Sequence, residues 1–572
     1  MGNGARQWKI AERAPHHYVA RLPDLHPLVA QVLYNRGLTD PARACAFLEG
    51  TFGEDNPFRI QGMNEAVAQI RQAIRAGAPI AVYGDFDADG VTATALLVLT
   101  LRALGGETHP YIPHRIEEGY GLNRPALTKL AYRGIRLVIT VDCGVRSPEE
   151  VAHARRLGME VIITDHHTLG PHLPEALAVL NPRRPDCSYP YKYLSGVGVA
   201  YKLAQALLRA NRQVPLPGST PLEEEDLLDL VALGTVADLA PLAGENRALV
   251  IRGLERLNTA PRPGLDALMR LAGVHQGRVS AMTIGYVLAP RLNAAGRVDH
   301  AKIAYQLLTV QYPGEAEHLA RQLDELNQQR QQLTAEALEK ARAAVIAEGV
   351  DRPLLFVADP SFPPGVVGLV ASRLAEEFYR PAIVVEQGVE ESRGSARSIP
   401  EFHITKALDH CADLLLRYGG HRAAAGFTVR TADLPELKTR LTDLAAEMLK
   451  DADLRPTLEI DAEVPLREMN GQVWKALQPL RPFGEGNPEP LFVSRRVRVR
   501  HQRAVGGNGA HLKLLLSDGN TVWDGIAFRQ GDWADHLPDY VDIAYHLQVN
   551  EWGGERRLQL NIQDIRPVLG GG

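Results

Sequence analysis

Short apolar runs alternate with longer helical stretches between about residue 78 and residue 164. Residues 79–83 read Pro-Ile-Ala-Val-Tyr, residues 137–141 read Leu-Val-Ile-Thr-Val, and residues 160–164 read Glu-Val-Ile-Ile-Thr. Apolar runs of this length, bounded by polar turns and separated by helices, are typical of buried parallel strands. The pattern therefore predicts an α/β sheet in this part of the chain.

Acidic residues follow each of these runs directly. Asp85 follows the first run, Asp142 the second and Asp165 the third. Because the carboxyl ends of parallel strands gather at one edge of a sheet, we expect these side chains to converge. Asp238 follows residues 230–236, Leu-Val-Ala-Leu-Gly-Thr-Val, a run whose pattern fits a helix as well as a strand.

The remaining pattern predicts further domains on both sides of this sheet. Short helices broken by prolines fill the first 75 residues, and a breaker-poor stretch from Gly314 to about Ala347 predicts a long helix joining two domains. Apolar runs at residues 353–358 and 381–385 flank another helical pattern and indicate a second α/β domain.

Alternating segments with Gly, Asn and Asp turns close the chain, for example residues 491–500, 511–516, 541–547 and 556–562. Several short strands of this kind are typical of a small β-barrel such as an OB-fold. The expected domains are an N-terminal helical cap (1–75), a catalytic α/β domain (76–260), a helical connector (261–348), a second α/β domain (349–452) and the barrel (453–572).

Composition supports a folded, multidomain protein of a reducing compartment. The chain has 572 residues, a length greater than one hydrophobic core usually supports. Its residues are 45% hydrophobic and 23% charged, as in ordinary globular proteins. The four cysteines show no Cys-x-x-Cys spacing, and no apolar segment has the length of a signal peptide or a membrane span. We therefore expect a cytoplasmic protein without membrane association. The net charge of −5 does not exclude a nucleic-acid partner, because carboxylates reserved for metal lower the total without weakening basic patches elsewhere.

The richest acidic segment is Asp85-Phe-Asp-Ala-Asp89, followed by Gly90 and a helical pattern. Alternating carboxylates suit Mg²⁺ or Mn²⁺, and an added imidazole such as His166 shifts the preference toward Mn²⁺. In isolation the segment fits a solvated turn or a helix cap equally well. Together with Asp142, Asp238 and the Asp165-His-His167 run it concentrates negative charge that is costly unless cations neutralise it. Two ions about 4 Å apart would support in-line phosphodiester hydrolysis.

These residues resemble the motifs of the DHH phosphoesterase superfamily. Asp165-His-His167 with the Asp85-x-Asp-x-Asp89 segment carries the first resemblance. Further segments resemble the RecJ family of single-strand-specific 5′-to-3′ DNA exonucleases within that superfamily, and together they span nearly the whole chain. They are residues 114–122 (His-Arg-Ile-Glu-Glu-Gly-Tyr-Gly-Leu), 141–144 (Val-Asp-Cys-Gly), 195–200 (Ser-Gly-Val-Gly-Val-Ala), 291–297 (Arg-Leu-Asn-Ala-Ala-Gly-Arg), 419–427 (Gly-Gly-His-Arg-Ala-Ala-Ala-Gly-Phe) and 483–488 (Phe-Gly-Glu-Gly-Asn-Pro).

The resemblance implies a parallel-sheet DHH core, a long connecting helix, a DHH-associated α/β domain and an OB-like barrel. It implies a catalytic set of Asp142, Asp165 and His167, with His167 facing the scissile phosphate. A packed or capping histidine is the alternative for His167. The implied ligands of two Mn²⁺ or Mg²⁺ ions are Asp87, Asp89, Asp142, His166 and Asp238, with Asp85 and Asp165 either joining them or orienting them.

Substrate contacts are expected mainly in the second α/β domain, where Gly-rich segments carry Ser395, Arg397 and His421. The resemblance adds Arg115 and Arg297. Ordinary glycine turns with solvated arginines are the alternative. This chain departs from the family at Pro363, where RecJ-like chains often have histidine. Residues 195–198 are too weak a signal to assign a nucleotide cofactor.

In the barrel, Arg496, Arg498 and Arg500 alternate along one expected strand and would share a face able to bind a DNA backbone. Trp523, Phe528 and Trp552 are available there for base stacking. Alternating arginines also protect edge strands from aggregation, and both roles are compatible.

The expected activity is metal-dependent 5′-to-3′ degradation of single-stranded DNA to 5′-mononucleotides, in DNA repair and recombination. A phosphodiesterase of short oligonucleotides or cyclic dinucleotides is a second interpretation, but those relatives usually lack the cap and the basic barrel. A non-catalytic DNA-binding scaffold is a third, and it should have lost several metal ligands. We expect a monomer, with a single-strand binding protein and a helicase as candidate partners.

Overall fold

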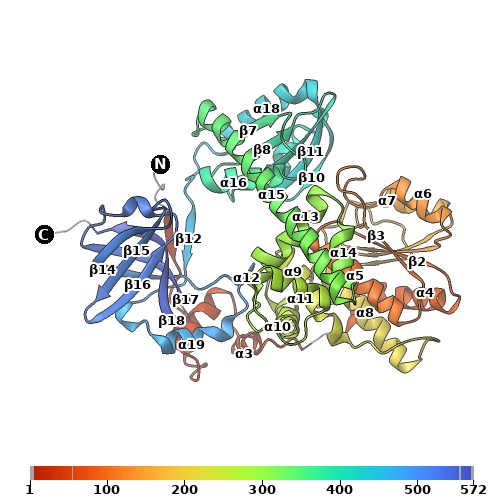
Figure 1. The fold of residues 1–572 in the computed structure, drawn as a ribbon, viewed down its shortest axis with the longest axis horizontal. Helices are drawn as coiled ribbons and strands as arrows, with labels where there is room; N and C mark the ends of the chain where they lie inside the picture. The colour runs from red at the N-terminus through yellow and green to blue at the C-terminus, as the bar shows by residue number, and fades with distance from the viewer. Residues whose placement is uncertain (1–5, 54–55, 553–554, 569–572) are drawn as a thin grey trace. The chain divides into compact units, whose positions relative to one another are not determined.

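The computed structural model describes residues 6–53, 56–552 and 555–568, and the side chains of residues 551–555 are not described. The chain forms two compact units (Figure 1). The smaller unit contains Met1–Gly53, Pro241–Ala248 and Arg455–Gly572, and the larger contains Glu54–Ala240 and Leu249–Leu454. The mixed α/β fold class is confirmed.

A parallel sheet of five strands organises the first part of the larger unit, with the order β3-β2-β4-β5-β6. All its pairings are parallel, and the three expected strands are confirmed. The strands are β2 (Ile80–Gly84), β3 (Thr108–Tyr111), β4 (Leu137–Val141), β5 (Glu160–Thr164) and β6 (Ala178–Leu180).

Helices cover this sheet because their apolar residues pack against the strands. On one face, Leu127 of α6 (Arg124–Tyr132) and Val151 of α7 (Pro148–Arg156) share a core with Tyr83 and Val138 of the strands. The other helices of this domain are α4 (Met63–Arg75), α5 (Ala88–Ala103), α8 (Gly196–Gln213) and α9 (Leu228–Ala237). The run before Asp238 is therefore a helix, which resolves the alternative that the sequence left open.

The expected long helix is α15 (Pro313–Glu348), which has 36 residues. It packs against α11, α13 and α14 at one end and α16 at the other. The helices that precede it in the chain are α10 (Gly244–Thr259), α11 (Pro263–Leu271), α12 (Ala281–Thr283), η3 (Ile284–Leu288), α13 (Ala289–Val298) and α14 (Lys302–Thr309).

The second α/β domain is a mixed sheet of five strands in the order β10-β11-β9-β8-β7. Only β7 and β8 pair in parallel. Its elements are β7 (Leu355–Asp359), α16 (Val367–Phe378), β8 (Ala382–Glu386), β9 (Glu391–Arg397), α17 (Ile404–Asp409), β10 (Leu415–Gly420), β11 (Ala424–Arg430) and α18 (Leu434–Met448).

The smaller unit is a β-barrel with a helical layer. The sheet runs β13-β14-β15-β16-β18-β17, and a further pairing of β14 with β17 closes it, so the expected OB-like barrel is confirmed. The strands are β13 (Ala462–Glu463), β14 (Phe492–Val505), β15 (His511–Asp518), β16 (Thr521–Ala527), β17 (Tyr540–Trp552) and β18 (Glu555–Pro567), and α19 (Gly471–Leu477) lies between β13 and β14 in the chain.

The N-terminal segment folds as part of this unit. β1 (Gln7–Ile10) pairs in parallel with β12 (Thr457–Ile460), and the next helices share one apolar core with the barrel. These helices are α1 (His16–Val19), α2 (Pro27–Asn35) and α3 (Pro41–Glu49). The five expected domain boundaries stay a prediction.

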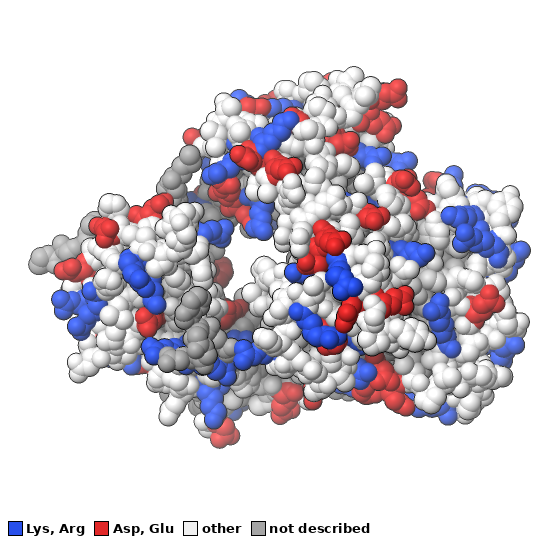
Figure 2. Space-filling view, viewed as in Figure 1, with Lys and Arg blue, Asp and Glu red and all other residues white. Residues whose placement is uncertain are grey.

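None of the helices among the described residues is long and apolar enough to cross a membrane. On the face shown in Figure 2, Lys and Arg side chains lie interspersed with Asp and Glu side chains.

Candidate metal centre and phosphate pocket

The acidic segment after β2 is both a helix cap and part of a charge cluster. Asp87 precedes α5, and its Oδ1 accepts hydrogen bonds from the backbone amides of Asp89 and Gly90, both at 3.0 Å. Carboxylates favour this position because the first amides of a helix lack intrahelical partners. The capping alternative is therefore correct for Asp87, and it holds the segment beside the other acidic residues.

Asp89 is held by the start of another helix. Its two carboxylate oxygens accept hydrogen bonds from the amides of Gly196 and Val197 at 2.6 and 2.8 Å. A Cβ atom on Gly196 would lie 2.6 Å from Cγ of Asp142, closer than folded proteins allow. Gly196 thus lets the start of α8 approach Asp142 closely, which is a packing reason for a glycine at this position.

Backbone strain marks one of the acidic residues and the residue that follows another. Asp142 has φ 59°, and Leu239, directly after Asp238, has φ 57°. Non-glycine residues rarely adopt this left-handed conformation, and such strain concentrates at functional sites. Asp142 is held by its amide, which donates to the carbonyl oxygen of Thr164 at 3.0 Å.

Asp165 orients the two histidines that follow it. Its Oδ1 accepts from the amides of His166 and His167 at 2.7 and 3.0 Å and lies 2.8 Å from Nδ1 of His167. Its Oδ2 accepts from the amide of Val145 at 2.9 Å. Among the described residues, Asp165 belongs to none of the groups of side chains that could hold a metal ion, which fits an orienting role better than metal ligation.

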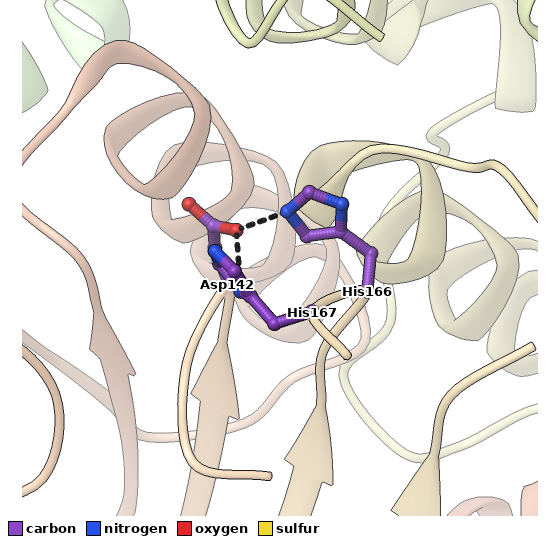
Figure 3. A group of neighbouring side chains, drawn as sticks. All are labelled: Asp142, His166 and His167. Atoms are coloured by element: carbon purple, nitrogen blue, oxygen red, sulfur yellow. Dashed lines mark ion pairs between the residues drawn. The ribbon is translucent and has the colours of Figure 1, made fainter. Parts of the chain in front are cut away.

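Asp142 and the two imidazoles point toward one another from neighbouring strand ends (Figure 3). Oδ1 of Asp142 lies 3.0 Å from Nε2 of His166 and 3.9 Å from Nδ1 of His167. Two ligands bound at right angles to one ion with bonds of about 2.1 Å lie roughly 3 Å apart. The separation of Asp142 and His166 therefore suits a shared cation.

The ligand atoms form three overlapping groups, in each of which all atoms lie within 4.8 Å of one another. Asp142 and His166 each belong to two of them, so the groups are connected. The groups are Asp85, Asp87 and Asp142; Asp89, His166 and Asp238; and Asp142, His166 and His167. All the aspartates and histidines expected at the metal site thus come together.

The raised pKa values of the buried aspartates indicate that the cluster binds cations. Burial and the neighbouring carboxylate of Asp87 raise the pKa of Asp89 to about 7, and burial with Asp89 and Asp87 raises that of Asp238 to about 9. Burial and the carboxylates around them also raise the pKa of Asp85 and Asp142 well above the usual range. Divalent ions would favour the ionised forms.

The two histidines differ in charge. Burial, together with the charge of His167, lowers the pKa of His166 to about 3, so its ring is neutral and free to bind metal. Burial opposes the charged form of His167, but the hydrogen bond and charge of Asp165 raise its pKa.

Several buried atoms of the cluster lack hydrogen-bond partners among the described residues. They are Oδ1 of Asp85, Oδ1 of Asp142 and Nε2 of His166. Buried polar atoms without partners are costly, and here each belongs to a group of metal-ligating type. The residues present therefore fit two hard divalent cations.

A cavity of about 220 Å³ in the larger unit is lined by the loop after β3, by the end of α13 and by the second α/β domain, and its Arg115 acts on Asp85 of the cluster. Burial and the neighbouring cations Arg115, Arg330 and Arg397 lower the pKa of Arg297 to about 9. Crowded, buried guanidinium groups favour an anion between them. The lining includes the predicted Arg115, Arg297, Ser395 and Arg397 together with Gly365 and Gly368.

The predicted His421 also lies at the metal centre. Its ring is nearly parallel to that of His167, with the ring centroids 6.5 Å apart and an interplanar angle of 8°. The structure adds Tyr120, whose hydroxyl donates to the carbonyl oxygen of Asp142 at 3.3 Å, and Asn293, whose Oδ1 accepts from the amide of Ala88 at 2.8 Å. Both lie in segments that carry the family resemblance, but spacing alone gave no reason to single them out.

The barrel arginines lie in the smaller unit, on a strand with two bulges. Arg496 has φ 51° and Arg500 is the extra residue of the bulge between Val499 and His501, so the expected regular row with Arg498 is interrupted. Nε of Arg500 donates to Oγ of Ser517 at 2.9 Å.

Another face of the barrel has a larger cavity, of about 770 Å³. Arg503 and Lys513 line it from directly opposite positions on β14 and β15, and the carboxylate of Asp524 lines it as well. Phe528 lines it as well and is 54% exposed. Trp523 is buried and therefore unavailable for stacking, and the side chain of Trp552 lies outside the described residues.

A parallel sheet with aspartates and an Asp-His-His run at its carboxyl edge, beside an arginine-lined pocket, defines a phosphoesterase of the DHH class. The model of the "DHH family, N-terminal domain" matches residues 79–235, that of the "DHHA1 domain" matches residues 351–450, and that of the "RecJ OB domain" matches residues 460–564. The chain belongs to the RecJ family.

Relatives along nearly the whole chain support this assignment. The chain is 39% identical over 567 residues to the single-stranded-DNA-specific exonuclease RecJ of Bacillus subtilis, in a match that covers 98% of this chain and 70% of that protein. It is 39% identical over 585 residues to the exonuclease RecJ of Salmonella typhimurium, in a match that covers 98% and 100%. The crystal structure of RecJ from Thermus thermophilus with Mn²⁺ matches with a TM-score of 0.84 and 34% identity, over 99% of this chain and 80% of that chain. A second crystal structure of that protein contains Mg²⁺ and matches with a TM-score of 0.78 and 33% identity, over 99% of this chain and 79% of that chain.

Proposed function

We propose that this chain is a metal-dependent exonuclease that removes 5′-mononucleotides from the 5′ end of single-stranded DNA, in DNA repair and recombination. The observation that carries the proposal is one arrangement in the larger unit. Two groups of metal ligands, which Asp142 and His166 connect through a third group, lie beside a small pocket lined by arginines. A site of this kind can hold a strand end by its phosphate while the next phosphodiester lies at the metals.

The two groups assign the metal ligands. Asp85 and Asp87 would hold one divalent ion and Asp89, His166 and Asp238 the other, with Asp142 shared between them. Mn²⁺ or Mg²⁺ ions bound there would supply an activated water and stabilise the attacking and leaving oxygens of the phosphate. Both ions occur in crystal structures of the RecJ of Thermus thermophilus.

The protein residues position the substrate around that chemistry. His167, protonated through Asp165, would donate a hydrogen bond to a nonbridging oxygen of the scissile phosphate. The guanidinium groups of Arg115, Arg297 and Arg397 and the Ser395 hydroxyl would hold the terminal 5′-phosphate. Because a cavity of about 220 Å³ accepts a phosphate but not a continuing strand, cleavage would begin at an end.

The barrel offers a second contact with the strand. The cavity lined by Arg503, Lys513 and Phe528 combines cations with an exposed ring, which suits the phosphates and bases of single-stranded DNA. OB-folds commonly bind oligonucleotides on the face of their second and third strands, and β15 and β16 line this cavity. The partner proteins, the monomeric state and the cytoplasmic location stay predictions.

An end-label assay tests the proposal. Single strands labelled at the 5′ or the 3′ end, and duplex DNA, would be offered with Mn²⁺ to the wild type, to Asp142→Ala and to the control Asp443→Ala, which changes an exposed carboxylate on α18. We expect immediate release of 5′-labelled mononucleotide from single strands, a loss of at least about 1000-fold in Asp142→Ala, and wild-type rates in Asp443→Ala. Release of the 3′ label first, or activity that survives in Asp142→Ala, would contradict the proposal.

A further inference from the structure

The loop after β6 carries an exposed cation that neither the metal ligands nor the phosphate pocket uses. Asn181, which is fully buried, donates from Nδ2 to the carbonyl oxygen of His167 at 3.0 Å and accepts at Oδ1 from the backbone amide of Arg183 at 2.8 Å. One side chain therefore ties Arg183 to the backbone of the Asp-His-His run.

Arg183 is paired with an aromatic ring rather than with a carboxylate. Its Cζ lies 5.9 Å from the ring centroid of Tyr193, which is 56% exposed. In the part of the chain that the structure describes, no carboxylate lies within ion-pair distance of Arg183, whereas the adjacent Arg184 makes two hydrogen bonds to Asp186. An exposed cation beside an exposed ring matches a nucleotide, because the cation suits the phosphate and the ring stacks on the base.

Arg183 is not among the residues that line the phosphate pocket, and Asn181 holds it beside the Asp-His-His run instead. The positive charge of Arg115 influences the group of Asp85 and Asp87. It lowers the pKa of Asp85, whereas burial and the Asp87 carboxylate raise that pKa. The positive charge of Arg183 influences the other group. It lowers the pKa of Asp238, whereas burial and the neighbouring carboxylates raise that pKa. The two cations therefore influence different metal-ligand groups.

We propose that Arg183 and Tyr193 bind the second nucleotide of the strand, which lies on the 3′ side of the scissile bond and keeps the scissile phosphate after cleavage. Arg183 contacts the phosphate that follows this nucleotide, and the ring of Tyr193 stacks on its base. The proposal rests on the proposed function, since it assumes that the strand passes from the phosphate pocket across the metals. The pair would make the enzyme prefer strands of three or more nucleotides to dinucleotides.

Substrate length tests the role of Arg183. A 5′-phosphorylated dinucleotide has no phosphate after its second nucleotide, whereas a trinucleotide has one. Arg183→Gln should lower kcat/KM for the trinucleotide about tenfold or more, the range expected when a charge-assisted hydrogen bond is removed, and leave the dinucleotide unchanged. Arg183→Lys should recover part of the loss, and the control Lys129→Ala, on the exposed face of α6, should cleave both substrates at wild-type rates.

An abasic substrate tests the role of Tyr193. Tyr193→Leu should lower kcat/KM for the trinucleotide about tenfold, as expected for one stacked base. The loss should vanish when the second nucleotide is abasic. Thermal unfolding of each variant verifies that the fold is intact.

Three outcomes would overturn the inference. They are equal losses of Arg183→Gln on both substrates, unchanged trinucleotide cleavage, or a Tyr193→Leu loss that persists on the abasic strand. A wild-type chain that cleaves neither substrate would overturn the proposed function and this inference with it, whereas retained cleavage with equal losses overturns only the inference.

Discussion

His166 and His167 are consecutive residues whose imidazole rings differ in proton affinity. Burial and the charge of His167 lower the pKa of His166, whereas Asp165 outweighs burial and raises the pKa of His167. We therefore propose that the ring of His166 is a neutral metal ligand and that the ring of His167 is a cationic hydrogen-bond donor. The resemblance implied these two roles, and the hydrogen bonds of Asp165 supply their physical cause.

Asp165→Asn tests this division of roles. The variant keeps the shape of the side chain but removes the charge that favours protonated His167. We expect a 10- to 100-fold lower kcat, the usual range for a residue that orients a metal site, with little change in KM. The control Asp186→Asn alters an exposed carboxylate of a nearby loop and should keep wild-type kcat. An unchanged kcat in Asp165→Asn would contradict the assignment.

Gly196→Ala tests the close approach of α8 to the aspartates. The added Cβ would lie 2.6 Å from Cγ of Asp142, so the carboxylate or the helix must move. Displacements of about 1 Å at a reacting site can cost about 100-fold in rate, and we expect a loss of that size in kcat/KM. Gly314→Ala is the matched control, because nothing lies within 4 Å of its added Cβ. Comparable rates for the two variants would show that the approach is not required.

At the scale of elements, the convergence of the acidic residues could be predicted because parallel strands bring their carboxyl ends together. This reasoning placed Asp85, Asp142 and Asp165 correctly. It could not decide whether the segment before Asp238 is a helix or a strand, because an apolar run of seven residues is compatible with either.

Other features depend on contacts that no local pattern encodes. The phosphate pocket joins Arg115 with Ser395, which are far apart in sequence, and only the family resemblance brought them together beforehand. In the barrel, the bulge at Arg500 interrupts the regular alternation, and the pairing of Arg503 with Lys513 follows from the register of β14 and β15. Strand register depends on the turn and on the packed face of the strand. Counting alternate positions therefore predicted neither the bulge nor this pairing.

The barrel cavity gives a prediction at this scale. The double change Arg503→Gln and Lys513→Gln should weaken binding of a 20-nucleotide strand and reduce the magnitude of the slope of log K against log salt by about 1.4, or about 0.7 for each cation removed. Trinucleotide cleavage should stay unchanged. Arg498→Gln serves as the comparison on the same strand and should have the smaller effect. Fluorescence anisotropy measures the binding, and an equal or larger effect of Arg498→Gln would favour the arginine row over the cavity.

At the scale of the whole molecule, the metal centre links folding to pH. Burial and repulsion raise the pKa of Asp89 to about 7 and that of Asp238 to about 9, from the ordinary value of 3.8. For each of these groups, the folded, metal-free chain binds more protons than the unfolded chain at pH values between the ordinary pKa of 3.8 and the raised pKa. The stability of the metal-free chain therefore falls as the pH rises through this range. Bound cations favour the ionised carboxylates and oppose the loss.

The stabilisation by metal should therefore grow with pH. Added Mg²⁺ should raise the Tm of the larger unit more at about pH 8.5 than at about pH 6, with a difference of about 3 °C or more. Differential scanning calorimetry with and without EDTA measures both values. Asp238→Asn should reduce the difference, since it removes one of the repelling charges. A Tm increase that is independent of pH would contradict the electrostatic account.

The central claim is that the connected ligand groups hold two catalytic cations. Crystals of the chain soaked in Mn²⁺, with data collected at the manganese absorption edge, test it most directly. We expect two anomalous peaks about 4 Å apart, one within bonding distance of Asp85 and Asp87 and one of Asp89, His166 and Asp238, with Asp142 touching both. A single peak, or peaks away from these residues under conditions where the chain cleaves DNA, would contradict the account.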